Sequence, residues 1–158
     1  MTETQNWSAR LTELGVTLPP VVPPVAAYVP ALRTGNYVYT SGQLPIVDGR
    51  LTTKGKVGAD VSDDDAKAGA RTCALNALAA IDALVGIDSV VRIIKVVGFV
   101  ASAEGFTGQP GVVNGASEFF GEIFGEAGAH ARSAVGVAEL PLGAPVEVEV
   151  IAEVRTEA

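Results

Sequence analysis

Val146-Glu-Val-Glu-Val-Ile-Ala-Glu-Val154 alternates apolar and acidic residues over most of its length. A period of two is the pattern of a β-strand that buries one face and exposes the other. A second strand-like run, Arg132 to Leu140, lies just upstream, and Pro141-Leu-Gly-Ala-Pro145 separates the two runs. Because proline lacks the N–H that ladder pairing needs, these residues predict two C-terminal strands joined by a short connection.

Two segments further upstream have the apolar spacing of amphipathic helices. Ser62-Asp-Asp-Asp65 can begin the first, since Ser62 can cap free backbone N–H groups and the aspartates favour the positive helix end. Pro110 suits the first turn of the second. The apolar stripes are Ala66, Ala70, Cys73, Ala77, Ile81 and Leu84, ended by Gly86, and Val113, Ala116, Phe120, Ile123 and Ala127, closed by Gly128.

The remaining strands are predicted from short runs of β-branched and aromatic residues. Residues 90–100 are rich in β-branched side chains and read as a buried strand. Runs at 27–32 and 36–41 flank Thr34-Gly35, a tight-turn signal, and Asp48-Gly49 begins a further loop. This order predicts an α+β fold with a mixed β-sheet and two helices packed on one face. The other face keeps apolar and aromatic groups, so another subunit is expected to cover it.

The N-terminal part of the chain is predicted to be a helix followed by an extended connector. Trp7, Leu11 and Leu14 recur at helical spacing, and Gly15 follows as a stop. The proline-rich run from 18 to 25 excludes both helix and central strand. We therefore divide the chain into an N-terminal helix and connector, residues 1–25, and one main domain, residues 26–158.

Composition restricts the class of protein. The chain has 158 residues, a single cysteine and a net charge of -7, so an intramolecular disulfide is impossible and nucleic-acid binding is disfavoured. No basic and apolar leader and no apolar run of about 20 residues is found, which predicts a cytoplasmic protein without a membrane segment. The mean hydropathy of +0.34 is high for a small monomer and indicates apolar surface buried between subunits.

Most familiar catalytic patterns are missing from the sequence. Gly105-Phe-Thr-Gly108 lacks the lysine of a phosphate-binding loop. His130 is the only histidine, which excludes a multi-histidine metal site and makes a serine–histidine–aspartate triad improbable. Cys73 lies on an apolar helix stripe and is interpreted as a small core residue. We expect neither a metal nor a cofactor.

Arg132 and Glu147 are the two charged residues that invite a functional interpretation. Arg132 begins a strand of small residues, where its guanidinium could hold a carboxylate by two parallel hydrogen bonds. An arginine at a strand end is also a common surface charge. Glu147 shares a strand face with Glu149 and Glu153, and periodicity alone does not separate a general base from a solvated face.

Three separated motifs carry a family resemblance. Asn36-Tyr-Val-Tyr-Thr-Ser-Gly-Gln-Leu-Pro45 resembles the early segment of the Rid family, also called the YjgF or endoribonuclease L-PSP family. Val113-Asn-Gly-Ala-Ser-Glu-Phe-Phe120 resembles its helix motif. Ala131-Arg-Ser-Ala-Val-Gly-Val-Ala-Glu-Leu-Pro141 and the strand after it resemble the closing signature. The resemblance spans about Tyr28 to Val154, within the Rid-like domain of residues 26–158.

The resemblance implies a chorismate-mutase-like α+β fold and a homotrimer with ligand clefts between subunits. It also implies an imine deaminase, a hydrolase that converts 2-aminoacrylate, 2-iminopropanoate or 2-iminobutanoate to 2-oxo acids and ammonia. Arg132 matches the arginine that holds the substrate carboxylate, and Glu147 the glutamate that activates water. The implied substrate-binding positions are Tyr28, Ser41, Gly42, Asn114 and Ala134.

The sequence departs from the family pattern in the closing motif. Ala134 replaces a frequent cysteine and can still offer its backbone N–H, while Gly136 replaces an acidic residue. Both changes are expected to enlarge the cleft, and the loop from Ala101 to Gly111 is longer than usual. Two alternatives stay open: a non-catalytic protein that binds small carboxylic acids, and an endoribonuclease, which the acidic charge balance opposes.

Overall fold

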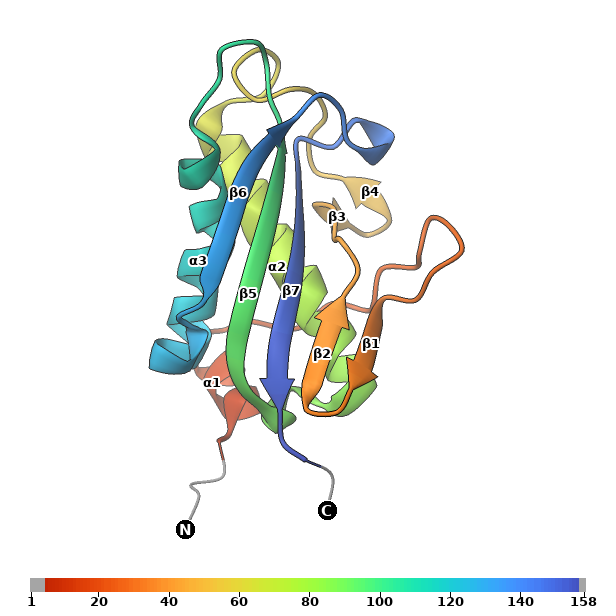
Figure 1. The fold of residues 1–158 in the computed structure, drawn as a ribbon, viewed down its shortest axis with the longest axis vertical. Helices are drawn as coiled ribbons and strands as arrows, with labels where there is room; N and C mark the ends of the chain where they lie inside the picture. The colour runs from red at the N-terminus through yellow and green to blue at the C-terminus, as the bar shows by residue number, and fades with distance from the viewer. Residues whose placement is uncertain (1–4, 157–158) are drawn as a thin grey trace.

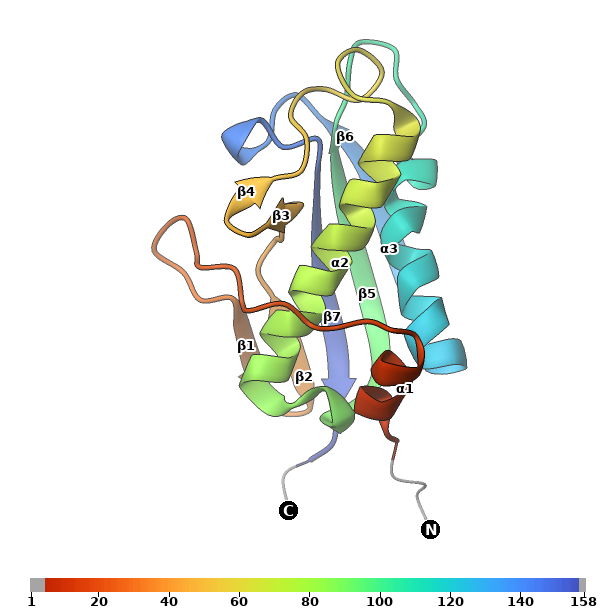
Figure 2. The same cartoon turned by 180° about the vertical axis from the view of Figure 1, so that it is seen from behind.

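The computed structural model describes residues 5–156. Five strands form the main sheet in the order β1-β2-β7-β5-β6, and only the β5–β6 pair is parallel. Helices α2 and α3 cover one face of this sheet, as the two opposite views show (Figures 1 and 2), so the predicted mixed sheet with two helices on one face is confirmed. The elements are α1 (Trp7–Glu13), β1 (Ala31–Thr34), β2 (Tyr37–Thr40), β3 (Ile46–Val47), β4 (Arg50–Leu51), α2 (Asp63–Val85), β5 (Val90–Ala101), α3 (Gln109–Phe124), β6 (Ala131–Val137) and β7 (Val146–Val154), with 3-10 turns at Ile87–Ser89, Gly125–Gly128 and Pro141–Gly143.

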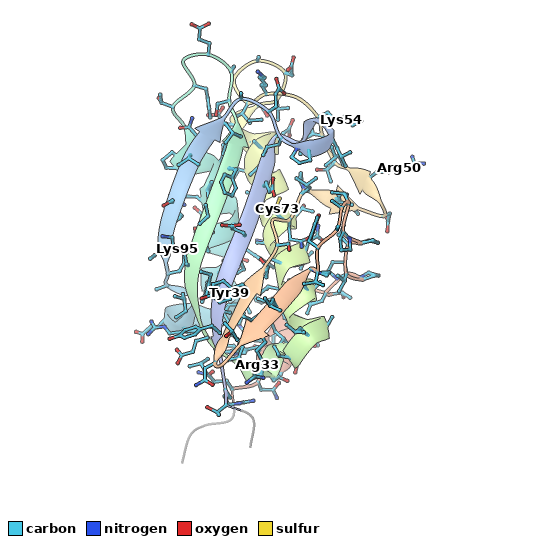
Figure 3. The ribbon with its side chains drawn as sticks, turned by 45° about the vertical axis from the view of Figure 1, so that its right-hand side comes forward. Arg33, Tyr39, Arg50, Lys54, Cys73 and Lys95 are labelled. Carbon is cyan, nitrogen blue, oxygen red and sulfur yellow. The ribbon has the colours of Figure 1, made fainter. Side chains whose placement is uncertain are left out.

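The core lies between the sheet and the two helices, and β7 is the middle strand of the sheet. All five inward residues of β7 predicted from the alternation are buried, and the residues between them are half-buried. Burying a valine side chain stabilises a fold by roughly 1.5–3 kcal/mol, so this strand alone is a large contributor. Cys73 is a buried residue of α2 (labelled in Figure 3), its Sγ lies 3.8 Å from the Val146 carbonyl oxygen of β7, and burial raises the pKa of its thiol. It is a core residue, as predicted.

Small residues allow α2 and α3 to pack closely. A Cβ at Gly115 of α3 would collide with the Lys67 carbonyl oxygen of α2, so glycine is needed there. Ser62 caps α2 through its side chain, which accepts a hydrogen bond from the Asp65 N–H at 3.1 Å. By length and hydropathy α2 could cross a membrane, but 56% of the apolar window is buried inside the fold, as in a core helix.

Several predicted boundaries shift in the structure. The first strand begins at Ala31, because Pro30 and the bends before it keep residues 27–30 out of the sheet. Asp48-Gly49 is a tight turn with positive φ at both residues and joins the strands of the hairpin β3–β4, where a loop was expected. Strand β6 ends at Val137, and α3 ends at Phe124 before the 3-10 turn that closes at Gly128.

Helix α1 packs against the same core. The Trp7 indole N–H donates to the Val90 carbonyl oxygen at 2.8 Å, and its ring meets Phe124 edge-on at 5.0 Å between centroids. Leu11 is buried. From α1 the proline-rich connector crosses α2 on the outer side of the helix layer (Figure 2). Trp7 is thus the anchor of a packed helix, as its spacing predicts.

Candidate functional site

Arg132 lies on β6, the edge strand of the sheet, and its side chain turns toward α3. Its Nη1 donates to Asn114 Oδ1 at 2.7 Å and to Ser117 Oγ at 3.3 Å, while Nη2 has a long contact with the Pro110 carbonyl oxygen at 3.4 Å. Within residues 5–156 no carboxylate pairs with this guanidinium. Neutral acceptors therefore hold the arginine in place without neutralising its charge, which leaves it competent to bind an anion.

Ser117 and His130 stand next to Arg132 and were not predicted to be part of the site. The Gly128 carbonyl oxygen lies 2.6 Å from His130 Nδ1 and can only accept, so Nδ1 donates to it. His130 Nε2 lies 2.9 Å from the Ser117 hydroxyl oxygen, within hydrogen-bond distance. The hydroxyl oxygen in turn presents a lone pair to Arg132. This chain of contacts holds the guanidinium through the serine.

The Arg132 groove, as we name the depression lined by Asn114, Ser117, His130 and Arg132, has a volume of about 410 Å³ and is open to solvent. Its side chains are a guanidinium, an amide, a hydroxyl and an imidazole, which suit an anionic ligand. In the part of the chain that the structure describes, no three His, Cys, Asp or Glu side chains cluster closely enough to hold a metal ion.

Ala134 and Gly136 follow Arg132 on the same strand. Ala134 pairs with Gly98 of β5, is half-buried and packs against the core. At Gly136 an added Cβ would lie 2.8 Å from Gln109 Nε2 and 3.0 Å from Ser102 Oγ. The expectation of an enlarged cleft is therefore wrong at Gly136, because these two side chains from the 101–111 region occupy the space.

Glu147 lies on β7 and faces the side of the sheet that carries no helix. Partial burial raises the pKa of its carboxyl group, and the nearby charge of Glu149 raises it further. Gly42 lies against it so closely that a Cβ there would collide with Glu147 Oε1. The absence of a side chain at Gly42 thus makes room for the carboxylate of Glu147.

Ser41 and Tyr28 lie near Gly42 and organise the loop before β1. The Ser41 hydroxyl donates to the Val29 carbonyl oxygen at 2.6 Å, and its backbone N–H donates to the Pro30 carbonyl oxygen at 2.8 Å. The phenol oxygen of Tyr28 accepts from the Val25 N–H at 3.2 Å. Tyr28 and Gly42 line one small hollow together with part of the connector.

The predicted residues fall into two groups on opposite faces of one sheet. Glu147 pairs with Phe99 of β5, whereas Arg132 pairs with Val96, so a whole strand separates them. Val96 is buried under the helices and Phe99 lies on the other face, so the two side chains point away from each other. Within one chain, Glu147 and Arg132 therefore do not face a common ligand. One group holds Arg132, Asn114 and Ala134, and the other holds Glu147, Gly42, Ser41 and Tyr28.

Comparison with known proteins identifies the family. The family model described as "YjgF/chorismate mutase-like, putative endoribonuclease" matches residues 8–154. The protein TCP17 of Trypanosoma cruzi is 42% identical over 150 residues, which are 94% of each chain.

Two solved structures extend the comparison. The crystal structure of Atu1372 from Agrobacterium tumefaciens is 44% identical, with a TM-score of 0.87 over 94% of this chain and 92% of that one. Escherichia coli TdcF with bound serine is 29% identical, with a TM-score of 0.62 over 88% of this chain and 94% of that one. The motifs, the sheet order and these matches agree, and the chain belongs to the YjgF/chorismate mutase-like, or Rid, family.

Proposed function

We propose that the protein hydrolyses small imines and enamines that carry a carboxylate, such as 2-aminoacrylate, to 2-oxo acids and ammonia. The observation that carries this proposal is the guanidinium of Arg132, oriented by Asn114 and Ser117 and unneutralised by any carboxylate of the described residues. Two parallel hydrogen bonds from an arginine match the geometry of a carboxylate. The structure of TdcF, a family member, with bound serine supports a small carboxylate as the class of ligand.

The reaction needs little beyond positioning and one base. An enamine such as 2-aminoacrylate first moves a proton from nitrogen to its methylene carbon and becomes an imine. Water then adds to the C=N carbon, and one of its protons goes to the nitrogen. The resulting carbinolamine passes its hydroxyl proton to the nitrogen and breaks its C–N bond, which releases ammonia and leaves a carbonyl. Glu147 is our candidate for directing this water, because a carboxylate with a raised pKa is better matched to proton transfer near neutral pH than an ordinary surface glutamate. Arg132 holds the substrate while this happens.

A complete site then requires two copies of the chain. Arg132 and Glu147 lie on opposite faces of the sheet, so one chain does not direct both groups at one small molecule. A cleft between subunits can combine the Arg132 group of one copy with the Glu147 group of the next. This requirement agrees with the homotrimer that the family resemblance implies.

The face of the sheet without helices supports such an assembly. Large apolar side chains there are exposed in the isolated chain, among them Leu32, Tyr39 and Val135, at 62, 44 and 42%. Figure 3 shows Tyr39 standing on this face. Surfaces of this kind are usually covered by a partner. Light scattering should give about three times the chain mass of 16.1 kDa, and a monomer at all micromolar concentrations would contradict the shared cleft.

The direct test is release of 2-oxo acid from freshly generated 2-aminoacrylate, with buffer and the Arg132→Ala variant as controls. Acceleration over buffer that depends on Arg132 supports the proposal. A protein that binds 2-oxobutanoate but never accelerates hydrolysis would instead be a non-catalytic carboxylate-binding protein. The separation of Arg132 from Glu147 within one chain is the observation that favours this second candidate, should the copies not assemble.

A further inference from the structure

A second cleft lies under the proline-rich connector, away from Arg132. The connector passes over α2 (Figure 2), and between it, α2 and the β3–β4 hairpin a cleft of about 240 Å³ remains. We name it the connector cleft. It is more enclosed than the Arg132 groove and mostly apolar, and its lining includes Pro20, Val22, Ile46, Asp48, Leu75 and Asn76.

Asn76 is the unusual residue of this lining, because a primary amide is only 2% exposed at the edge of an apolar cleft. Its Nδ2 donates to the carbonyl oxygens of Leu44 at 3.1 Å and Ile46 at 3.0 Å. Carbonyls only accept, so the amide has a single possible orientation and its Oδ1 points away from both. Within residues 5–156 no group donates to Oδ1. Every side-chain polar atom of these residues that is fully shielded from solvent has a hydrogen-bond partner, so Oδ1, which has no donor, is accessible to solvent.

The other polar side chains of the connector cleft also offer acceptors. The Thr72 hydroxyl donates its proton to the Ala68 carbonyl oxygen at 3.3 Å, which leaves its oxygen to accept. Asp48 contributes a carboxylate at the hairpin turn and makes no ion pair with any described residue. The lining contains no lysine, arginine or histidine. The ligand it fits must therefore donate hydrogen bonds and favours a positive charge, the opposite of the Arg132 groove.

The size and walls of the connector cleft restrict the rest of the ligand. An apolar cavity of about 150 Å³ is large enough for benzene. About 240 Å³ therefore accommodates a ring or a branched chain with a short extension. Pro20 and Val22 on one side and Leu75 on the other offer flat apolar surfaces to such a body.

We propose that the connector cleft binds a small apolar amine, with its hydrocarbon body between Pro20, Val22 and Leu75 and its ammonium group donating to Asn76 Oδ1 and the Asp48 carboxylate. An ammonium supplies several donors and a charge that matches Asp48. The proposal does not depend on imine hydrolysis, because none of the residues in the two groups of the candidate active site lines the connector cleft. Val22, Pro23 and Ile46 also line the neighbouring hollow beside Tyr28 and Gly42.

Titration calorimetry of the full-length protein tests the proposal with four probes of one shape. Benzylamine should bind most tightly, benzyl alcohol more weakly and benzyl methyl ether more weakly still. Benzoate should not bind in the connector cleft, so any benzoate binding to the wild type should be lost in Arg132→Ala. The comparison of alcohol with ether tests the acceptor at Asn76 without changing that buried residue. Equal affinity for the amine and the ether would overturn the proposal, as would no saturable binding of the amine.

Variants of the lining assign the site. Asp48→Asn, which tolerates the positive φ of 50°, should weaken benzylamine by about tenfold and leave benzyl alcohol unchanged. Leu75→Trp should fill the cleft and reduce binding of both, whereas Asp64→Asn, outside the cleft, should change neither. Benzylamine binding that is lost in Arg132→Ala but kept in Leu75→Trp would place the amine elsewhere and refute the connector cleft as its site.

Discussion

The two faces of the central sheet hold functional candidates in different environments. On the helix-covered face, Arg132 is held by an amide, a hydroxyl and, through that hydroxyl, a histidine. On the open face, Glu147 is half-buried, its pKa is raised, and Gly42 makes room for its carboxylate. The first group is complete in one chain, whereas the second lies beside an apolar surface that lacks a cover. If the proposed function holds, we expect substrate binding to reside in the fold of each chain and turnover to depend on assembly.

Loss of the Arg132 guanidinium should have the largest effect. Arg132→Ala removes a charged double contact, which is worth about 3 kcal/mol, so kcat/KM should fall about a hundredfold. Circular dichroism should be unchanged, since the side chain is half-exposed at an edge strand. Arg50→Ala, in the exposed part of the β3–β4 hairpin, is the matched control and should keep its activity. An unchanged rate in Arg132→Ala would remove this residue from the mechanism.

Loss of the Glu147 base should reduce turnover while binding survives. For Glu147→Gln we expect kcat to fall roughly thirtyfold, less than a general base usually contributes because imines already hydrolyse readily. The dissociation constant of 2-oxobutanoate should stay the same. Glu153→Gln, on the same strand face, is the control and should be nearly silent. Glu149→Gln removes a charge that raises the pKa of Glu147 and should have an effect smaller than that of Glu147→Gln. If all three variants turn over alike, Glu147 has only a structural role.

The raised pKa of Glu147 also gives a pH dependence of stability. The folded state binds this proton more tightly than the unfolded state, so the contribution of Glu147 to stability falls as pH rises from the unfolded pKa through the folded one. The Glu147→Gln variant has no titrating group at this position, so it does not lose stability in this way as pH rises. Its melting temperature should therefore exceed that of the wild type at neutral pH, and the difference should shrink toward zero in acid. A difference that is constant with pH would contradict the assignment.

Adding a methyl group at Gly42 should act on turnover through Glu147. In Gly42→Ala the new Cβ displaces the carboxylate, and a misplaced catalytic group costs about tenfold in kcat. The melting temperature should change little, because the displaced atoms are the end of a flexible side chain. Gly111→Ala, where a Cβ meets open space on α3, serves as the control. Equal activity of both variants would separate Gly42 from the reaction.

The smallest effect is expected at Ser117. Ser117→Ala removes one acceptor from Arg132, a hydrogen bond worth about 1 kcal/mol, so KM should rise about fivefold with kcat unchanged. Ser117→Thr keeps the hydroxyl and should restore the wild-type KM. A fall in kcat instead of a rise in KM would mean that the serine and His130 take part in proton transfer.

The sequence predicts the sheet and both long helices because their signals are local. The alternation of β7 and the cap at Ser62 depend on neighbours in the chain, and both appear as predicted. The β3–β4 hairpin was missed although Asp48-Gly49 is a strong hairpin signal, because its strands have only two residues each.

The candidate site was only partly predictable. Family motifs single out Arg132 and Glu147, but which face each occupies follows from the pairing of β6 and β7 with β5, which no local pattern encodes. Ser117 and His130 are 13 residues apart and meet only because α3 and β6 lie side by side. The contacts of Asn76 are likewise distant in sequence, since its partners are Leu44 and Ile46, the first residue of β3. A signal from sequence alone was not available for these contacts.

Subunit complementation tests the division of the site between two chains most directly. Arg132→Ala and Glu147→Gln chains are co-expressed in equal amounts, purified as mixed assemblies and assayed for 2-oxo acid release from 2-aminoacrylate. In a random mixture about one cleft in four combines an intact Arg132 group with an intact Glu147 group, so about a quarter of the wild-type activity should return from two nearly inactive parents. Activity no higher than the mean of the two parents would contradict a cleft shared between subunits.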